Sequence, residues 1–226
     1  GAGIVLNARE GAATDNEVTN RGLINAQYAG VGIYGNGPAS GNKVTNESGA
    51  TIYAGRGIAI YGGSGVTDNT VTNAGDIHAS SGYSEVGISL TSDRGAMSGN
   101  TVINDVSGNI FSDGSGISLQ SGYYSSGDLL DNTVTNNGAI FADYAGIYVG
   151  GGHDLSGNAV TNTGGIIGGS GYDSDGIVLS ASHDILGNVV TNASTARITV
   201  YEDGVVLSAS HDVSDNTVDN IGHIAN

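Results

Sequence analysis

One short motif constrains the fold of this chain more than any other feature of its sequence. The pattern Asn-x-Val-x-Asn occurs eight times, and successive copies begin 26 to 32 residues apart. The first asparagines of these copies are Asn16, Asn42, Asn69, Asn100, Asn132, Asn158, Asn188 and Asn216. A period of this length is typical of repeat architectures, in which each unit buries its apolar side against its neighbours. The sequence therefore indicates a stack of about eight similar units.

Two further series recur in the same order within the units. An isoleucine follows each motif by a few residues, at Ile24, Ile52, Ile77, Ile110, Ile140, Ile166, Ile198 and Ile224. A glycine followed by β-branched residues forms the other series, at Gly3, Gly32, Gly57, Gly87, Gly116, Gly146, Gly176 and Gly204. Three such runs in each unit predict three short strands. The predicted fold is all-β, a right-handed parallel β-helix (β-solenoid) of about eight coils of 26–32 residues with three short strands each.

The glycine content supports this interpretation. The chain has 40 glycines and one proline among 226 residues, and a glycine in a helix interior costs roughly 1 kcal/mol relative to alanine. Hydrophobic residues still make up 38 % of the chain, which is enough for a core and disfavours disorder. We therefore expect the glycines at the corners between strands.

Strand geometry decides which side chains of the motif point into the coil. Alternate residues of a strand face opposite ways, so the central valine and both asparagines share the inward face. Stacked asparagines about 4.8 Å apart satisfy one another's amides, and the eight first asparagines are therefore predicted to form a structural ladder. An apolar or alanine residue stands three positions before each of them, as Val66 and Met97 do, and predicts a loop anchored to the core.

Charge and cysteine content restrict the partners. The formal net charge is −16, of which −5 falls in residues 1–113 and −11 in residues 114–226. This acidity disfavours nucleic acid and anionic membrane surfaces as partners. The chain contains no run of 18 apolar residues, so we expect no membrane insertion by this segment. It also contains no cysteine, which fits export through an oxidising compartment.

The repeat pattern also suggests how copies of the chain could associate. We expect residues 1–226 to form a single β-solenoid domain with no obvious terminal caps. The pattern starts with a strand of the glycine series and stops after a strand of the isoleucine series, so a second copy placed head to tail would continue the coil. The chain is therefore expected either to be a piece of a longer rod or to form a filament of stacked copies.

The repeats resemble the passenger regions of bacterial autotransporters. The resemblance is carried by stretches such as Asn69–Ile77 (NTVTNAGDI) and Asn132–Ile140 (NTVTNNGAI), and it covers essentially the whole chain. Such passengers include adhesins, self-associating factors and enzyme carriers. The resemblance therefore implies an extracellular or cell-surface rod that acts in self-association or adhesion. The β-barrel, signal segment and protease motif of that family have no counterpart in these residues.

A repeated His-Asp pair is the most specific candidate site. The pair stands at the same offset before three successive motifs, and an aspartate takes its place one unit earlier. The residues of this column are Asp128, His153, Asp154, His183, Asp184, His211 and Asp212. Carboxylates about 4.8 Å apart repel one another, and histidine or a cation such as Ca²⁺ would offset that repulsion. The alternative is a turn copied by repeat duplication, with its charges in solvent; no other cofactor is expected.

Tyrosines in the loops between the isoleucine and glycine series form a candidate contact surface. They are Tyr28, Tyr83, Tyr144, Tyr172 and Tyr201. Their rings would stack on cell-surface or matrix glycans or on a neighbouring rod, or else pack against the stem of their own loop. A carbohydrate-active β-helix enzyme is the alternative function. It is disfavoured because Arg197 is the one basic residue after Arg94, so acids such as Asp173 and Asp175 have few basic residues nearby.

Overall fold

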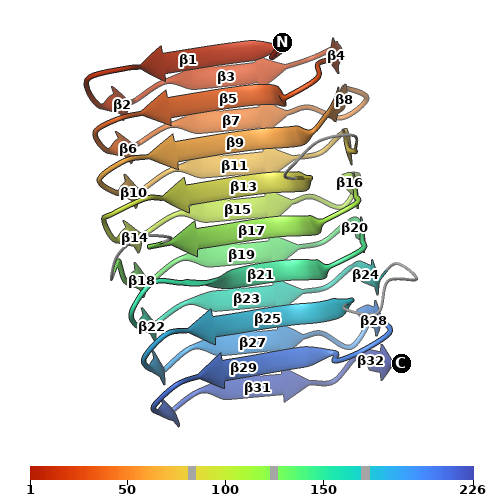
Figure 1. The fold of residues 1–226 in the computed structure, drawn as a ribbon. Helices are drawn as coiled ribbons and strands as arrows, with labels where there is room; N and C mark the ends of the chain where they lie inside the picture. The colour runs from red at the N-terminus through yellow and green to blue at the C-terminus, as the bar shows by residue number, and fades with distance from the viewer. Residues whose placement is uncertain (81–84, 123–126, 169–173) are drawn as a thin grey trace.

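The computed structural model describes residues 1–80, 85–122, 127–168 and 174–226, and these residues form 32 β-strands. The strands wind into a right-handed coil that descends from the N-terminus to the C-terminus (Figure 1). Every strand pairs in parallel with its equivalent one coil away, which gives four sheets of eight strands each. The predicted parallel β-solenoid is confirmed, but each coil contains four strands rather than three.

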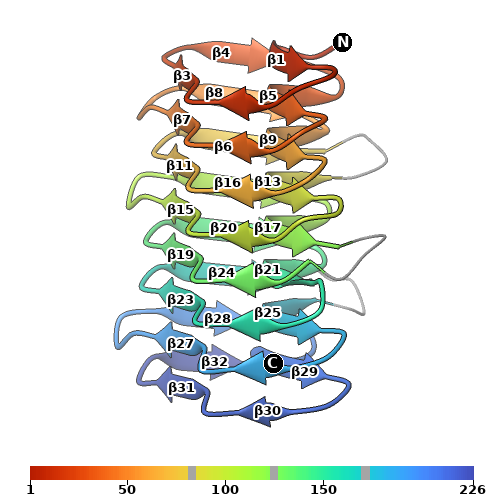
Figure 2. The same ribbon diagram turned by 90° about the vertical axis from the view of Figure 1, so that its left-hand side faces the viewer.

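The four sheets, here named A to D in the order in which the chain visits them, form the four sides of the coil (Figures 1 and 2). Sheet A contains β1 (Ile4–Ala8), β5 (Ala29–Gly35), β9 (Arg56–Gly62), β13 (Val86–Ser92), β17 (Ser115–Ser121), β21 (Ala145–Gly151), β25 (Asp175–Ala181) and β29 (Val205–Ala209). Sheet B contains β2 (Ala13–Thr14), β6 (Ala39–Ser40), β10 (Val66–Thr67), β14 (Met97–Ser98), β18 (Leu129–Leu130), β22 (Leu155–Ser156), β26 (Ile185–Leu186) and β30 (Val213–Ser214).

The other two sheets carry the motif and the isoleucine series. Sheet C contains β3 (Glu17–Asn20), β7 (Lys43–Asn46), β11 (Thr70–Asn73), β15 (Thr101–Asn104), β19 (Thr133–Asn136), β23 (Ala159–Asn162), β27 (Val189–Asn192) and β31 (Thr217–Asn220). Sheet D contains β4 (Leu23–Asn25), β8 (Thr51–Ala54), β12 (Asp76–Ala79), β16 (Asn109–Ser112), β20 (Ala139–Ala142), β24 (Gly165–Gly168), β28 (Arg197–Thr199) and β32 (His223–Ala225).

Sheet B is the element that the sequence-based prediction missed. Its strands are two residues long, and the first residues of those in the interior coils, such as Val66 and Met97, are fully buried. The residue after each strand has a positive φ, 56° at Asp68 and 64° at Gly99, which turns the chain sharply. That turn separates the short strand from the motif strand, so the predicted loop is instead a strand with its own sheet.

The corner between sheets D and A explains the glycine series. A β-carbon added to Gly57 would lie 2.3 Å from Cγ2 of Ile77 and 2.5 Å from the carbonyl oxygen of Gly87. Because the corner approaches the next coil so closely, only glycine fits there. In the second coil this glycine is Gly30 and not the predicted Gly32, since Ile4 pairs with Val31. The shift is two residues, so the inward face of the strand is unchanged.

The core is a column of aliphatic side chains stacked in register. Isoleucines of sheet D, such as Ile52, Ile77 and Ile110, pair across neighbouring strands and are fully buried. The motif valines of sheet C stack in the same way, as Val71 pairs with both Val44 and Val102. Each coil therefore buries its apolar side chains against the coils above and below it.

Both asparagines of the motif form uninterrupted ladders inside the coil. In the first ladder, Nδ2 of each asparagine from Asn16 to Asn188 donates to Oδ1 of its equivalent in the next coil at 2.8–3.0 Å. The second ladder runs from Asn20 to Asn220 in the same way at 2.8–2.9 Å. All these bonds point toward the C-terminal end of the coil. The ladders satisfy amides that would otherwise be costly to bury.

Candidate functional site: a histidine–aspartate column

The repeated His-Asp pairs lie on the turn that joins sheet A to sheet B. His153 and Asp154 precede β22, and the next two pairs precede β26 and β30 in the same position. The backbone amide of His183 donates to the carbonyl of His153 at 3.0 Å, and that of His211 donates to the carbonyl of His183 at 3.0 Å. These bonds continue the parallel pairing through the turn, so the three pairs lie in one column.

The imidazole rings of the column stack on one another. The ring centroids of His153 and His183 are 4.3 Å apart, with an angle of 13° between the planes. Those of His183 and His211 are 4.2 Å apart and more tilted, at 38°. The stacking therefore restricts the orientation of the three rings relative to one another.

The aspartates form a ladder of their own beside the rings. The backbone amide of Asp154 donates to Oδ1 of Asp128 at 3.2 Å, and the amide of Asp184 donates to Oδ1 of Asp154 at 3.2 Å. The amide of Asp212 donates to Oδ1 of Asp184 at 3.0 Å. The carboxylates of Asp128, Asp154 and Asp184 therefore each accept from a backbone amide of the next coil, and this accounts for their place in the turn.

The histidines lie against these carboxylates. Nδ1 of His153 is 3.0 Å from Oδ1 of Asp154 and 4.0 Å from Oδ1 of Asp128. Nδ1 of His183 is 3.0 Å from Oδ1 of Asp154 and 3.1 Å from Oδ2 of Asp184. The nitrogen of His183 thus faces carboxylates from two successive coils.

The electrostatic effect of this arrangement is clearest at Asp154. Burial alone raises the pKa of this carboxyl. Hydrogen bonds from His183, from the backbone amide of Asp184 and from His153 together lower the pKa by more than burial raises it. The net pKa lies below the ordinary value of an aspartate, because these donors favour the charged form. The column therefore stabilises the charged form of Asp154.

The column brings together most of the candidate residues at the surface of the coil. The side chains of His153 and His183 are 43 % and 36 % exposed, so solvent reaches both imidazole rings. Ligand atoms of His153, Asp154 and His183 lie within 4.8 Å of one another, as do those of His183, Asp184 and His211. Asp128 and Asp212 belong to neither group, and their part in the column is the aspartate ladder.

The candidate tyrosines do not form a continuous row within the described residues. Tyr28, Tyr144 and Tyr201 lie on the corner between sheets D and A and are 67 %, 52 % and 56 % exposed. At least one coil separates each of them from the next. Tyr83 and Tyr172 lie outside the described residues.

Sequence reasoning missed an aromatic column on the outer face of sheet D. Tyr53, His78, Phe111 and Phe141 occupy equivalent positions in four successive coils. Their ring centroids are 4.6, 4.7 and 4.9 Å apart, and neighbouring planes lie within 16° of parallel. The signal was present in the sequence, because each of these residues directly follows an isoleucine of the isoleucine series.

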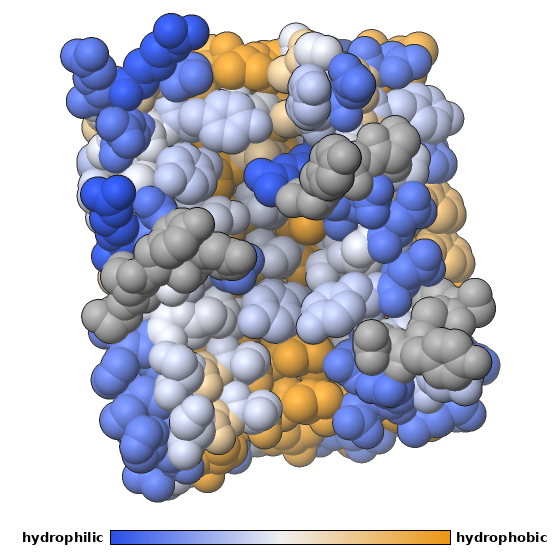
Figure 3. All heavy atoms as spheres, in the orientation of Figure 1, coloured by the Kyte–Doolittle hydropathy of each residue, from blue (hydrophilic) through white to orange (hydrophobic). Residues whose placement is uncertain are grey.

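Two tyrosines on the outer face of sheet A, the face seen in Figure 3, lie across glycines of their own strands. A β-carbon at Gly32 would be 2.4 Å from Cε2 of Tyr34, and one at Gly150 would be 2.7 Å from the hydroxyl oxygen of Tyr148. Burial is the main cause that raises the pKa of both phenols. One face of each ring therefore rests on the sheet.

The four-sided coil, the asparagine ladders and the polar column define a parallel β-solenoid repeat protein. Comparisons with protein-family models, with curated proteins and with solved structures give no match for this chain. The resemblance to autotransporter passengers therefore rests on the repeat motifs alone. None of the described segments is a helix with the length and hydropathy needed to span a lipid bilayer.

Proposed function

We propose that the chain is a structural rod element that acts outside a bacterial cell, by self-association or adhesion, in the manner of the passenger regions that its repeats resemble. The asparagine ladders and the stacked core support this role, because they give a regular rod that needs no disulfides. The mechanism we favour is end-to-end stacking, in which one copy adds its coils to those of another.

The observation that carries this proposal is the match between the first and last coils. At the equivalent inward positions, the first coil has Leu6 where the last has Leu207, and Val18 where the last has Val218. If the second copy stacks in the same register as successive coils of one chain, Nδ2 of Asn216 would also meet Oδ1 of the second copy's Asn16. A second copy therefore continues both the core and the polar ladder.

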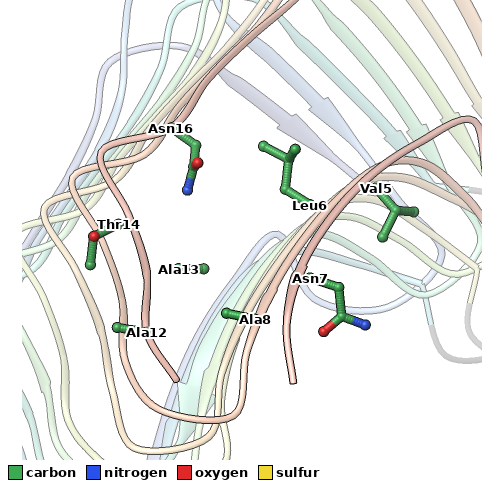
Figure 4. Close-up of a pocket in the computed structure, with 8 residues that line it drawn as sticks. All are labelled: Val5, Leu6, Asn7, Ala8, Ala12, Ala13, Thr14 and Asn16. Atoms are coloured by element: carbon green, nitrogen blue, oxygen red, sulfur yellow. The ribbon is translucent and has the colours of Figure 1, made fainter. Parts of the chain in front are cut away.

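Both end coils present apolar side chains to solvent. In the first coil, Leu6 and Ala8 are partly exposed and point into the open interior beside Asn16 (Figure 4). In the last coil, the inward-facing Val213 and Val218 are 48 % and 50 % exposed. A further coil of the same kind, from the same chain or from another copy, would cover these side chains, and their burial favours association.

One corner position of the two end coils disfavours end-to-end stacking. Asp15 and Asp215 occupy the same corner position, where Asp68 and Asp131 are each followed by a glycine in the next coil. A β-carbon in that next coil would lie about 2.3–2.5 Å from the aspartate Oδ1. Stacking would place Asp215 against a second copy's Asp15, which has such a β-carbon, so the carboxylate of Asp215 must turn aside.

This mismatch gives a sharp test of end-to-end stacking. Asp15→Gly removes the conflicting β-carbon, and its φ of 54° suits glycine. The variant should therefore associate at lower protein concentration than the unaltered chain, while Val218→Asp, which places a charge in the end face, should associate less. Light scattering after size-exclusion chromatography measures the mass at each concentration, and electron microscopy distinguishes end-to-end rods from bundles.

Salt and a matched variant complete the design. The net charge of −16 opposes association, so added salt should promote it. Asp131→Gly, in the middle of the rod, serves as the control because it removes a corner carboxylate away from both ends. Equal behaviour of Asp15→Gly and Asp131→Gly, or a monomeric mass for every variant at high concentration and high salt, would contradict end-to-end stacking.

Glycan adhesion is a second candidate, favoured by the tyrosines of sheet A. Tyr34 and Tyr148 rest on the sheet with one ring face, and such flat aromatic rings offer the other face to an apolar sugar surface. Tyr34→Ala and Tyr148→Ala should weaken retention on a glycan surface, whereas Val106→Ala, at an exposed apolar residue outside sheet A, serves as the control. Unchanged retention in both sheet A variants would contradict this candidate.

A further inference from the structure

We propose that the histidine–aspartate column binds a divalent transition-metal ion of the Zn²⁺ type, at one of two overlapping sites that share His183. The first site consists of His153, Asp154 and His183, and the second of His183, Asp184 and His211. Each contributes two imidazoles and one carboxylate. This inference is independent of the rod function and would hold for a rod that never self-associates.

The spacing of the ligand atoms fits a small tetrahedral ion. With metal–ligand bonds of about 2.0 Å, two ligand atoms of a tetrahedral site lie about 3.3 Å apart. In the first site, Oδ1 of Asp154 is 3.0 Å from Nδ1 of His153 and 3.0 Å from Nδ1 of His183. An ion that displaces the ring protons therefore needs only small movements of the side chains.

The surroundings of the ligands hold them in place before an ion arrives. The backbone amides of Asp184 and Asp212 orient the carboxylates of Asp154 and Asp184, at 3.2 and 3.0 Å. Stacking of the three rings restricts their rotation. Such supporting contacts orient metal ligands in known sites and raise their affinity.

The charge balance of the column favours a cation. Nδ1 of His183 faces both Asp154 and Asp184, yet an imidazole nitrogen carries at most one proton and cannot serve two carboxylates fully. Carboxylates also recur one coil apart on both sides of these sites. A dication at the shared nitrogen would neutralise the two nearest carboxylates at once.

The donor set decides which ion binds. Imidazole nitrogen with carboxylate oxygen suits Zn²⁺, Ni²⁺ or Cu²⁺, whereas Ca²⁺ and Mg²⁺ take oxygen ligands alone. The imidazole ligands therefore favour a transition-metal ion of the Zn²⁺ type over the Ca²⁺ that the carboxylates alone would suggest. Since the side chains of His153 and His183 are partly exposed, water completes the coordination. Because the two sites share His183, one ion fills the column at a time.

Titration calorimetry with Zn²⁺ on the 226-residue chain tests this proposal. We expect one ion per chain, and His183→Gln should weaken binding on the order of ten- to a hundredfold, because it damages both sites. His153→Gln and His211→Gln each leave one site intact and should weaken binding much less. His223→Gln is the matched control, since β32 lies on the opposite side of the coil (Figure 1).

Three results would overturn the proposal. They are equal binding of Ca²⁺ and Zn²⁺, unchanged Zn²⁺ binding by His183→Gln, and a loss in His223→Gln as large as that in His183→Gln. Circular dichroism of each variant verifies that the β-solenoid is intact. If His183→Gln does not fold, Zn²⁺-dependent changes in the imidazole NMR signals of the unaltered chain decide the matter: shifts confined to His153, His183 and His211 support the site, and their absence contradicts it.

Discussion

The carboxylate of Asp68 fills the space in which a β-carbon of Gly99 would lie. A β-carbon built on Gly99 would be 2.5 Å from Oδ1 of Asp68, far inside normal contact distance. The pairs Asp15–Gly41 and Asp131–Gly157 repeat this relationship at 2.3 Å. Aspartate and glycine alternate along most of this corner for that reason, because an aspartate in one coil excludes a side chain from the next.

A side chain at this corner has two energetic costs, backbone strain from the positive φ and overlap with the aspartate of the preceding coil. Comparison of Gly187 with Gly99 distinguishes them. Gly187 has a φ of 62°, close to the 64° of Gly99, but it follows Gly157 and has no atom within 4 Å of an added β-carbon. Gly187→Ala should therefore cost the backbone strain alone, about 1–2 kcal/mol. Gly99→Ala should cost more than this, because the carboxylate of Asp68 must also turn aside. Urea unfolding measures both losses, and equal values would contradict the steric explanation.

The asparagine ladder predicts a strong effect of position. Asn104 is fully buried, accepts from Nδ2 of Asn73 and donates to Oδ1 of Asn136, both at 2.8 Å. Asn104→Ala leaves both partners unpaired in the core and should lower the free energy of unfolding by about 2–5 kcal/mol. Asn220→Ala, at the open end of the same ladder, should cost only about 1 kcal/mol. Water can replace the exposed Oδ1 of Asn220 as the acceptor for Nδ2 of Asn192. A loss at Asn220 as large as that at Asn104 would contradict a buried, cooperative ladder.

These ladders also show how far the sequence alone could reach. The inward valines and asparagines were predictable because they recur at every second residue within strands of four residues, as in Thr70–Asn73. Sheet B was not predictable, because a strand of two residues such as Val66–Thr67 contains one inward side chain and shows no alternation. The aromatic column was missed because residues such as His78 and Phe111 are unremarkable within one coil. Only the register of neighbouring coils brings them into contact.

Two phenols predict how stability changes in alkaline solution. Burial raises the pKa of Tyr34 and Tyr148 in the folded state above the value of 10.0 that is ordinary for tyrosine. The unfolded chain therefore loses these protons first. The stability that the neutral phenols contribute is complete below about pH 10 and is lost as the pH rises through the raised pKa.

The double variant Tyr34→Phe/Tyr148→Phe tests this sign directly. It has no phenol to ionise at either position, so its free energy of unfolding should fall less steeply than that of the unaltered chain above about pH 10. Urea unfolding at a series of alkaline pH values measures the slope. An identical slope in both proteins would contradict the burial of these two phenols.

The aromatic column of sheet D predicts a difference between its interior and its edge. Phe111 stacks on His78 and on Phe141, whereas Tyr53 stacks on His78 and pairs in register with Asn25 on its other side. An aromatic pair contributes about 0.5–1.5 kcal/mol beyond the area that it buries, so Phe111→Ala should lose two such contributions and Tyr53→Ala one. A double-mutant cycle with Phe141→Ala isolates the Phe111–Phe141 term, which should lie in that range. Additive losses in this cycle would show that the rings are merely neighbours on an exposed strand face and contribute nothing to holding successive coils together.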